Sequence, residues 1–356
     1  MSAPVPATID EAVSPHWLSL AIADLYPGTR ITAVRDVAIV NAVAARARIH
    51  VTYAGPDVDR LPAHLFVKGG FAPDTAHLLA GGAYYREARF YRDLAPDLGD
   101  LGFPLCLHAS ADEASRQGVV VLEDLVAAEA TLYRLGATHD AAEAGAFVDA
   151  LARLHARSFR LIGQAPAAFD WVPRTADVVP RLIKDDPLAL LAAHLAGERG
   201  TVVPAGLRNP ARILAAMRAL MASDDDAAPF LLHGDMHLGN IFTRGGRPGW
   251  YDWQTLQRGS WAMDLVYYLV GSLTPEDRQK HVAPLLARYL SCLSEHGGPV
   301  VGMDEALRLY RRYLAYGLFI WSVARETIVP IPTLNPLLHR FAVAAEDAET
   351  FGALSV

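Results

Sequence analysis

Cysteine is scarce in this sequence. Only Cys106 and Cys292 occur among the 356 residues, and they lie far apart. Two distant cysteines exclude a disulfide framework and a cysteine-based metal cluster. Blocks of basic residues are missing too, and the net charge is −7, so we expect no nucleic-acid partner. The same charge balance suits a cationic or neutral substrate.

Long apolar runs are also missing. No stretch reaches the roughly 18 uninterrupted apolar residues that a membrane-spanning helix needs. The first residues, MSAPVPATIDEAV, have neither the basic start nor the apolar run of a signal peptide, and residues 1–15 read as a loose lead-in. We therefore expect a soluble, cytoplasmic protein without a membrane partner. Hydrophobic residues make up 52% and charged residues 20%, which predicts a packed core, and the length predicts two lobes.

One segment, Leu231–Leu265, combines polar residues with turn signals. A glycine pair, Gly245-Gly246, separates two short apolar strands, and this pattern predicts a hairpin. Folding about Gly246 places Asn240 opposite Asp252, give or take one residue. Directly opposed residues lie about 4.5–5.5 Å apart at Cα, so an amide oxygen and a carboxylate there can share Mg²⁺, which prefers oxygen ligands.

Asp235 lies just upstream of this pair and is left for a separate role. Two other interpretations compete with a magnesium site. His233 and His237 have the spacing of a helical zinc pair, although Gly234 and Gly239 disfavour a helix, which makes a metal-dependent hydrolase a weak alternative. An ordinary loop and hairpin fits any one of these polar residues better than it fits all of them together.

The pattern H-G-D-x-H-x-x-N followed by D-W resembles the aminoglycoside phosphotransferase and choline-kinase-like family of small-molecule kinases. Asn240 follows Asp235 at the spacing of the H-R-D-x-x-x-x-N motif of protein kinases. Gln254 after Asp252-Trp253 resembles the variant of the ecdysteroid-kinase-like branch. The resemblance implies an α+β, bilobal protein-kinase-like fold. We expect a small N-terminal lobe, residues 1–122, with an antiparallel sheet and one helix, and a larger, mainly helical lobe, residues 123–356.

The resemblance also implies an activity, the ATP- and Mg²⁺-dependent transfer of a γ-phosphoryl group to a hydroxyl of a small molecule. Asp235 would orient the hydroxyl and accept its proton, while Asn240 and Asp252 would hold Mg²⁺. The acceptor stays open between an aminoglycoside, a choline-like molecule and an apolar alcohol, with a lean to an apolar or mixed one. A nucleotide-binding pseudokinase with a regulatory role is the alternative from another class. The oligomeric state is left open.

A lysine on an apolar strand and a glutamate on an apolar helix face form a second candidate group. Leu65–Gly69 is typical of a strand and contains Lys68, and Ala83–Leu94 is helical by period, with Glu87 on its apolar face. A carboxylate there costs several kcal/mol unless it is paired. Lys68 is the natural partner, and the pair resembles the strand-lysine and helix-glutamate pair of kinases, whose lysine holds the α- and β-phosphates.

Two further segments complete the expected nucleotide site. Strands over 34–40 and 47–53 predict a hairpin whose tip at Asn41 has no glycine, unlike the Gly-rich loop of protein kinases. This leaves Asn41 as the candidate phosphate contact of the tip. The buried strand over 118–125 resembles the hinge between lobes. There, backbone groups of Glu123, Asp124 and Leu125 would hold an adenine edge, while the side chains of Glu123 and Asp124 turn away.

Helical periodicity follows the hinge, first over 145–159, then in proline-broken pieces over 171–226 and in two or three helices over 271–351. We interpret His155 as a core residue and Asp264 as a capping acid at a helix start, which the resemblance implies also braces the catalytic loop. We expect a solvated loop at Asp224, Asp225 and Asp226. The aromatic residues of the last part predict core, with some available to line an acceptor site: Tyr310, Tyr313, Tyr316, Phe319 and Trp321.

Overall fold

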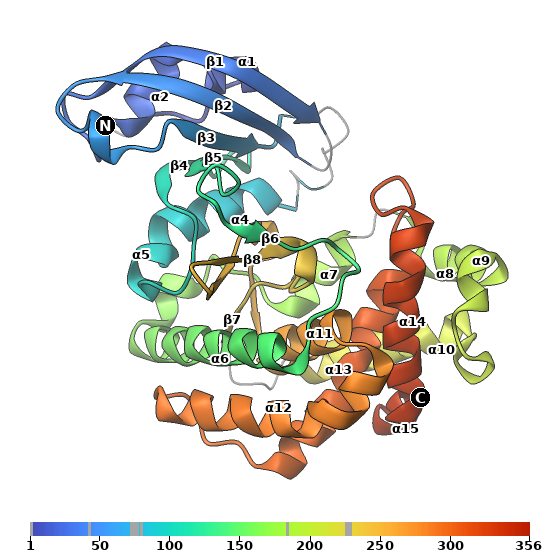
Figure 1. Ribbon diagram of the computed structural model, residues 1–356. Coiled ribbons are helices and arrows are strands. Elements are labelled where there is room, and N and C mark those ends of the chain that lie inside the picture. Colours follow the sequence, from blue (N-terminus) through green and yellow to red (C-terminus); the bar gives the residue numbers. More distant parts are fainter. Residues whose placement is uncertain (1–2, 42–43, 72–77, 79–80, 183–184, 225–229) are drawn as a thin grey trace. The chain divides into compact units, whose positions relative to one another are not determined.

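The computed structural model describes residues 3–41, 44–71, 78, 81–182, 185–224 and 230–356 (Figure 1). The chain divides into two compact units. The first contains Met1–Leu132 and Phe242–Leu256, and the second contains Tyr133–Ile241 and Gln257–Val356. The predicted α+β class is confirmed, with an antiparallel sheet near the N-terminus and a larger, mainly helical part. Across the described residues, no helix is long and apolar enough to cross a membrane.

A five-stranded antiparallel sheet forms the first unit, in the order β1-β2-β3-β5-β4. The predicted hairpin and the predicted lysine strand are confirmed. The strands are β1 (Arg30–Asn41), β2 (Ala45–Ala54), β3 (His64–Gly69), β4 (Cys106–Asp112) and β5 (Gln117–Glu123), with a 3₁₀ turn over Val58–Arg60.

The start of the chain packs on this sheet, so the expected loose lead-in is wrong from Ala3 onward. Helix α1 spans Ile9–Ala12, and α2 spans Pro15–Ile22, with Ser14 as its N-cap. The indole N–H of Trp17 donates to the Pro4 carbonyl at 2.9 Å. Trp17 belongs to the same buried apolar cluster as strand residues such as Val67. Sequence composition missed this because prolines and small residues here cap and pack rather than loosen the chain.

The predicted helix with Glu87 is present as α4 (Ala83–Arg89), a π-helical turn (Phe90–Leu94) and α5 (Ala95–Leu98). A short sheet in the order β6-β8-β9 follows, built from β6 (Thr131–Leu132), β8 (Ile241–Arg244) and β9 (Arg247–Trp250). The predicted hairpin is thus confirmed, with Gly245 and Gly246 as its two-residue turn. Both glycines have positive φ, 55° and 75°, which favours glycine at each position of such a turn.

Long helices build the second unit, as the periodicity predicts. Helix α6 begins with a capping box between Asp140 and Glu143. Proline starts or interrupts several of the following helices, as in α8 and α10. Strand β7 (Phe230–Leu232) pairs with β10 (Gln257–Gly259). The helices are α6 (Ala141–Gln164), α7 (Thr175–Leu182), α8 (Pro187–Ala196), α9 (Glu198–Thr201), α10 (Pro210–Asp224), α11 (Ala262–Ser272), α12 (Pro275–Glu295), α13 (Met303–Val323), α14 (Ile331–Asp347) and α15 (Thr350–Ala353), with 3₁₀ turns over Pro166–Phe169, Ala205–Leu207, Leu238–Asn240 and Trp253–Thr255.

The C-terminal aromatic residues lie in the core, as predicted. Five of them sit on α13, and all are at most 5% exposed: Tyr310, Tyr313, Tyr316, Phe319 and Trp321. Two predictions fall on positions that the structure leaves out. Asp225 and Asp226 lie outside the described residues, as does the side chain of Asp224, and the side chain of Asn41 at the end of β1 is likewise outside them.

Candidate active site

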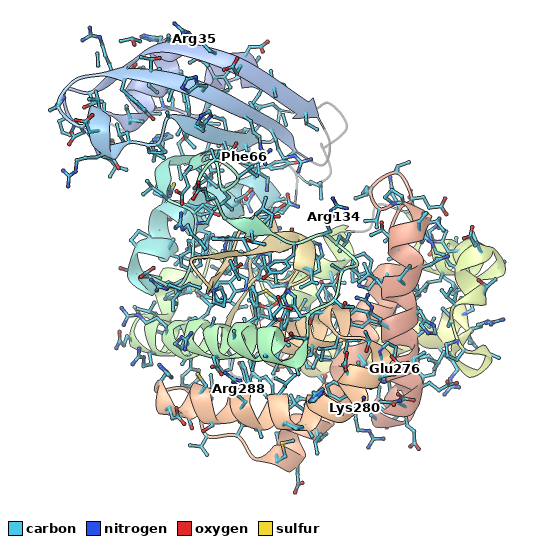
Figure 2. All side chains as sticks on the ribbon, viewed as in Figure 1. Arg35, Phe66, Arg134, Glu276, Lys280 and Arg288 are labelled. Atoms are coloured by element: carbon cyan, nitrogen blue, oxygen red, sulfur yellow. The ribbon has the colours of Figure 1, made fainter. Side chains whose placement is uncertain are left out.

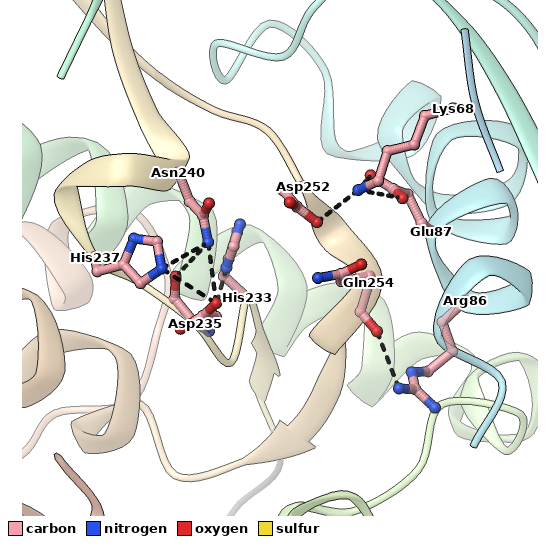
Figure 3. Close-up of polar contacts among 9 residues, drawn as sticks. All are labelled: Lys68, Arg86, Glu87, His233, Asp235, His237, Asn240, Asp252 and Gln254. Atoms are coloured by element: carbon pink, nitrogen blue, oxygen red, sulfur yellow. Dashed lines mark hydrogen bonds and ion pairs between the residues drawn. The ribbon is translucent and has the colours of Figure 1, made fainter. Parts of the chain in front are cut away.

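In the first unit, Lys68 lies between two carboxylates (Figure 3). Its Nζ is 2.7 Å from Oε2 of Glu87 and 2.6 Å from Oδ1 of Asp252. The side chains of Lys68 and Glu87 are 5% and 4% exposed, whereas that of Asp252 is 24% exposed. The structure therefore brings together Lys68 and Glu87, as the helical period predicts, and adds Asp252 to them.

The charges of this group explain its protonation. Burial lowers the pKa of Lys68, but Asp252 and Glu87 raise it more, so the ammonium stays charged. Burial raises the pKa of Glu87 to about 7, against the opposing effect of Lys68, and the Asp252 carboxylate adds to the rise. Two carboxylates thus share a single ammonium. The group of three therefore carries excess negative charge. Asp252 is its more exposed carboxylate and is suited to bind a cation as well.

The segment after Asp252 is fixed to helix α4. Nη2 of the buried Arg86 donates to the Gln254 carbonyl at 2.9 Å, and Nη1 donates to the Gly81 carbonyl. The Trp253 ring stacks on Phe90 of the π-helical turn at a centroid distance of 3.7 Å. These contacts hold the backbone on which Asp252 adopts a left-handed conformation, with φ of 67°. No periodic pattern in the sequence singles out Arg86 for this role.

A cavity partly open to solvent adjoins Lys68. It extends to the predicted hinge residues Glu123, Asp124 and Leu125. Its walls belong to the first unit and mix charged side chains with apolar and aromatic ones: Arg46, Arg48, Phe66, Lys68, Glu87, Pro104, Leu122, Glu123, Asp124, Leu125, Leu132, Tyr251 and Asp252.

The acidic side chains of the hinge are occupied by protein partners. Oε1 of Glu123 accepts hydrogen bonds from the Leu105 N–H at 2.8 Å and from Arg244. Oδ1 of Asp124 accepts from the Val126 N–H at 2.9 Å, and its Oδ2 lies 3.4 Å from Nε of Arg48. Because these carboxylates are engaged, the backbone is what the hinge offers to a ligand.

In the second unit, Asp235 is held by its own loop. The Asn240 amide Nδ2 donates to the Asp235 carbonyl at 2.9 Å and to Oδ2 at 3.2 Å, and Nε2 of His237 lies 3.3 Å from Oδ2. Burial raises the pKa of Asp235, but His237, His233 and the Asn240 hydrogen bond lower it more. The carboxylate is therefore ionised at neutral pH.

The weak alternative of a zinc pair at His233 and His237 gains no support from the geometry. His237 faces Asp235 and Asn240, and no cluster of three histidine, cysteine or acidic side chains able to hold a metal occurs in the described part of the chain. His237 is a contact that the sequence interpretation missed, although its place in H-G-D-x-H is the available signal. Asn240 and Asp252 belong to different units, so their joint binding of a cation stays a prediction.

Asp264 supports the loop that carries Asp235. Its Oδ2 accepts from the His233 N–H at 2.7 Å, and its Oδ1 accepts from the Gly234 N–H at 2.9 Å. The brace of the catalytic loop that the resemblance implies is therefore confirmed, whereas the expectation of a helix cap is wrong. Asp264 lies in the first turn of α11, whose N-cap is Trp261, and both of its carboxylate oxygens accept hydrogen bonds from the loop. On the other side of the loop, the Tyr316 hydroxyl donates to the Gly234 carbonyl at 2.9 Å.

His155 lies behind this brace and is a core residue, as predicted. Its Nδ1 is 2.6 Å from the Tyr289 hydroxyl, and its Nε2 is 3.5 Å from Oδ2 of Asp264. The side chain is fully buried. His155 therefore packs behind the loop and does not take part in ligand binding directly.

Comparisons with known proteins concern the family and the fold of this chain. The model of the ecdysteroid kinase-like family matches residues 41–177 and 207–298. A GDP complex of a mutant aminoglycoside 2′-phosphotransferase-IIIa aligns with a TM-score of 0.50 and 14% identity, over 96% of this chain and 100% of that one. An amicoumacin kinase in complex with AMP-PNP and Ca²⁺ aligns with a TM-score of 0.50 and 12% identity, over 87% and 88%. Both similarities concern the fold. None of the curated proteins matches the sequence.

Proposed function

Because this chain belongs to the ecdysteroid kinase-like family, we propose that it is a kinase that transfers the γ-phosphoryl group of ATP to a hydroxyl of a small molecule. The observation that carries the proposal is the buried ammonium of Lys68, held by Glu87 and Asp252 at the wall of a cavity that reaches the hinge. A fixed ammonium beside such a cavity is suited to the α- and β-phosphates.

The base would bind at the hinge through its backbone. The Asp124 N–H donates to the His64 carbonyl at 3.1 Å, so Asp124 directs its backbone toward β3. Glu123, the last residue of β5, donates its N–H to the Leu105 carbonyl at 2.9 Å, so its backbone groups face away from β3. We therefore assign the base edge to the Glu123 carbonyl and the Leu125 N–H. A carbonyl accepts a hydrogen bond from the amino group of adenine but opposes the oxygen of guanine, which favours ATP over GTP.

Asp252 and Asn240 would hold Mg²⁺. When bound, this cation neutralises the charge of the phosphates. The donor set of one carboxylate and one amide oxygen fits this cation. Lys68 would orient the phosphates, with Glu87 fixing its ammonium. Phosphoryl transfer needs positioning and charge stabilisation more than covalent help from the protein.

Asp235 would orient the acceptor hydroxyl and accept its proton as the new bond forms. Its lowered pKa supports this role because the carboxylate is ready to accept a hydrogen bond at neutral pH. Asn240 and His237 would fix the carboxylate in one orientation, since both contact its Oδ2. Turnover then depends on the shape of this loop, which Asp264 braces.

The acceptor would be an apolar or mixed alcohol. Aromatic residues of the second unit gather beside the Asp235 loop. The Trp321 ring lies 6.0 Å from His237 and 6.0 Å from Tyr267, and Tyr267 lies 5.3 Å from Tyr316. Burial and then the charge of Asp235 raise the pKa of Tyr267. These rings are buried behind the loop, and their apolar character there favours an apolar skeleton over a polycationic sugar.

The test is acceptor-dependent ADP release from Mg·ATP over a panel of aminoglycosides, choline-like amines, and steroid-like and macrolide alcohols. We expect release with an apolar or mixed alcohol and formation of its phosphate ester. The glycine-free hairpin tip favours a pseudokinase as the second candidate. Tight ATP binding without ADP release across the panel would support that candidate, and failure to bind any nucleotide would overturn the kinase proposal.

A further inference from the structure

The hairpin between β1 and β2 has no glycine near its tip, so a backbone cradle of the kind that protein kinases place over the phosphates is not available in the sequence. We propose that the guanidinium of Arg46 binds the phosphate chain of the nucleotide in place of that cradle. The proposal rests on the proposed kinase function and adds a binding residue to it.

Arg46 lies directly beside Lys68. In the register of β2 and β3, Arg46 is the Cα partner of Lys68, and Arg48 is the partner of Phe66. Opposed residues of antiparallel strands direct their side chains to the same face, with Cβ atoms about 4.5–5.5 Å apart. Arg46, Arg48, Phe66 and Lys68 accordingly line the same cavity. A ligand whose phosphates meet Lys68 would therefore lie within reach of Arg46.

The charges that line the cavity leave Arg46 without a counterion. Three cations and four carboxylates belong to its wall. Lys68 is paired with Glu87 and Asp252. The other paired groups are Glu123 with Arg244 and Asp124 with Arg48. Among the described residues, no carboxylate forms an ion pair with Arg46, whose side chain is half-buried.

This difference separates Arg46 from Arg48. Arg48 is tied to the hinge by Asp124 and lies opposite Phe66 on β3, so it lies toward the base end of the cavity. Arg46 lies beside the lysine end and is available for an anion. A guanidinium donates two parallel hydrogen bonds to phosphate oxygens, which an ammonium cannot reproduce. A side chain on β2 can thus replace the backbone N–H groups of a glycine loop.

The test compares affinity along a series of ligands, from adenosine through AMP and ADP to ATP, with Mg²⁺ present. Dissociation constants are measured by calorimetry for the full-length wild type, Arg46→Ala, Arg46→Lys and Arg35→Ala. Arg35 is an exposed arginine of β1 outside the cavity and is the matched control for the lost charge (Figure 2).

We expect Arg46→Ala to weaken ADP and ATP binding by about 10- to 100-fold, the loss typical of a hydrogen bond to a charged group. Adenosine affinity should stay within about 2-fold, because the base does not meet Arg46. Arg46→Lys should recover part of the affinity, and Arg35→Ala should match the wild type at every ligand.

Three outcomes would overturn the inference. If Arg46→Ala binds ATP as tightly as the wild type does, and the wild type releases ADP, Arg46 does not bind the phosphates and the kinase proposal is unaffected. An equal loss for adenosine and ATP in a variant whose thermal unfolding matches wild type places Arg46 at the base. If the wild type binds none of the four ligands, the proposed function itself fails and takes the inference with it.

Discussion

Asp264 accepts a hydrogen bond from the backbone N–H of His233 at 2.7 Å, across 31 positions of sequence. Its second oxygen accepts from the next N–H, that of Gly234. Asp264 is 1% exposed, so water does not replace either bond if the carboxylate is lost. The loop that carries Asp235 therefore depends on a side chain from helix α11.

Asp264→Asn tests this dependence. The amide keeps one acceptor oxygen but places an NH₂ group against a backbone N–H, so we expect the free energy of unfolding to fall by about 1–3 kcal/mol. Turnover should fall by more than the loss of folded protein accounts for, because the loop that carries Asp235 shifts. Denaturant unfolding and ADP release measure the two effects. Asp304→Asn, at an exposed first-turn position of α13, is the control and should change neither.

Lys68→Met tests the shared ammonium. The change leaves the buried Glu87 beside Asp252 without a cation, and breaking a buried pair on one side costs about 3–5 kcal/mol. Adding Glu87→Gln removes the stranded charge, so the double variant should be more stable than Lys68→Met alone, by denaturant unfolding without nucleotide. Both should lose ATP affinity. Additive losses of stability in the double variant would contradict the coupling of Lys68 and Glu87.

The stability of the wild type and of Lys68→Met should depend on pH, and the direction of the dependence follows from Glu87. The pKa of Glu87 is raised to about 7 by burial. The folded state therefore holds a proton on Glu87 that the unfolded state releases, and stability falls as pH rises from about 4.5 toward 7. In Lys68→Met the compensating cation is gone, so its stability deficit should grow with pH. A deficit that is constant from pH 5 to pH 8 would exclude a stranded Glu87 carboxylate.

Local patterns in the sequence predict most of the elements around the candidate site. Helical period places Glu87 on the buried face of α4, and the apolar strand with Lys68 near its end gives its partner. The glycine pair predicts the hairpin turn, because both positions need positive φ. These features are encoded within a few residues, so pattern reasoning reaches them.

Contacts between distant segments are less visible in the sequence. From its place at a helix start alone Asp264 reads as a cap; its brace of the loop follows from the family resemblance, and the folded chain shows which N–H groups it binds. Arg86 precedes the glutamate that the period selects, and its bond to the Gln254 carbonyl depends on the return of Phe242–Leu256 to the first unit. Propensity and period carry no information about such pairings.

His108 predicts that acid destabilises the core of the first unit. The ring is 7% exposed, lies on β4 and forms a T-shaped contact with the Trp17 ring at a centroid distance of 5.4 Å. Burial lowers the pKa of His108 to about 4, against smaller opposing effects of Ala21 and Asp24. The unfolded chain therefore binds more protons between pH 6.5 and 4, and stability falls as the pH is lowered through this range.

The expected loss from this group is about 3 kcal/mol once the pH is below 4, from a pKa moved from 6.5 to about 4. His108→Gln removes the titration and should flatten the stability curve between pH 7 and pH 5 relative to wild type, measured by denaturant unfolding. His16→Gln, at an exposed site in α2, is the matched control. Parallel curves for His108→Gln and wild type would show that another group causes the acid sensitivity.

Asp235→Asn separates chemistry from nucleotide binding. The amide keeps the size of the side chain and an oxygen for the Asn240 contact, but it cannot accept the proton of an acceptor hydroxyl. Turnover should fall by about 10²- to 10⁴-fold, the range for loss of a proton acceptor. The cavity beside Lys68 is built entirely from the first unit, and Asp235 belongs to the second.

Mg·ATP affinity of Asp235→Asn should therefore stay close to wild type, measured by calorimetry on the same preparation used for ADP release. Asp177→Asn, at an exposed position of α7, should retain both activity and affinity. Loss of ATP affinity in Asp235→Asn would mean that the residue supports the nucleotide rather than the acceptor. Full turnover would remove Asp235 from the reaction altogether, and the acceptor hydroxyl would then need another proton acceptor, for which His237, 3.3 Å from the same carboxylate, is a candidate.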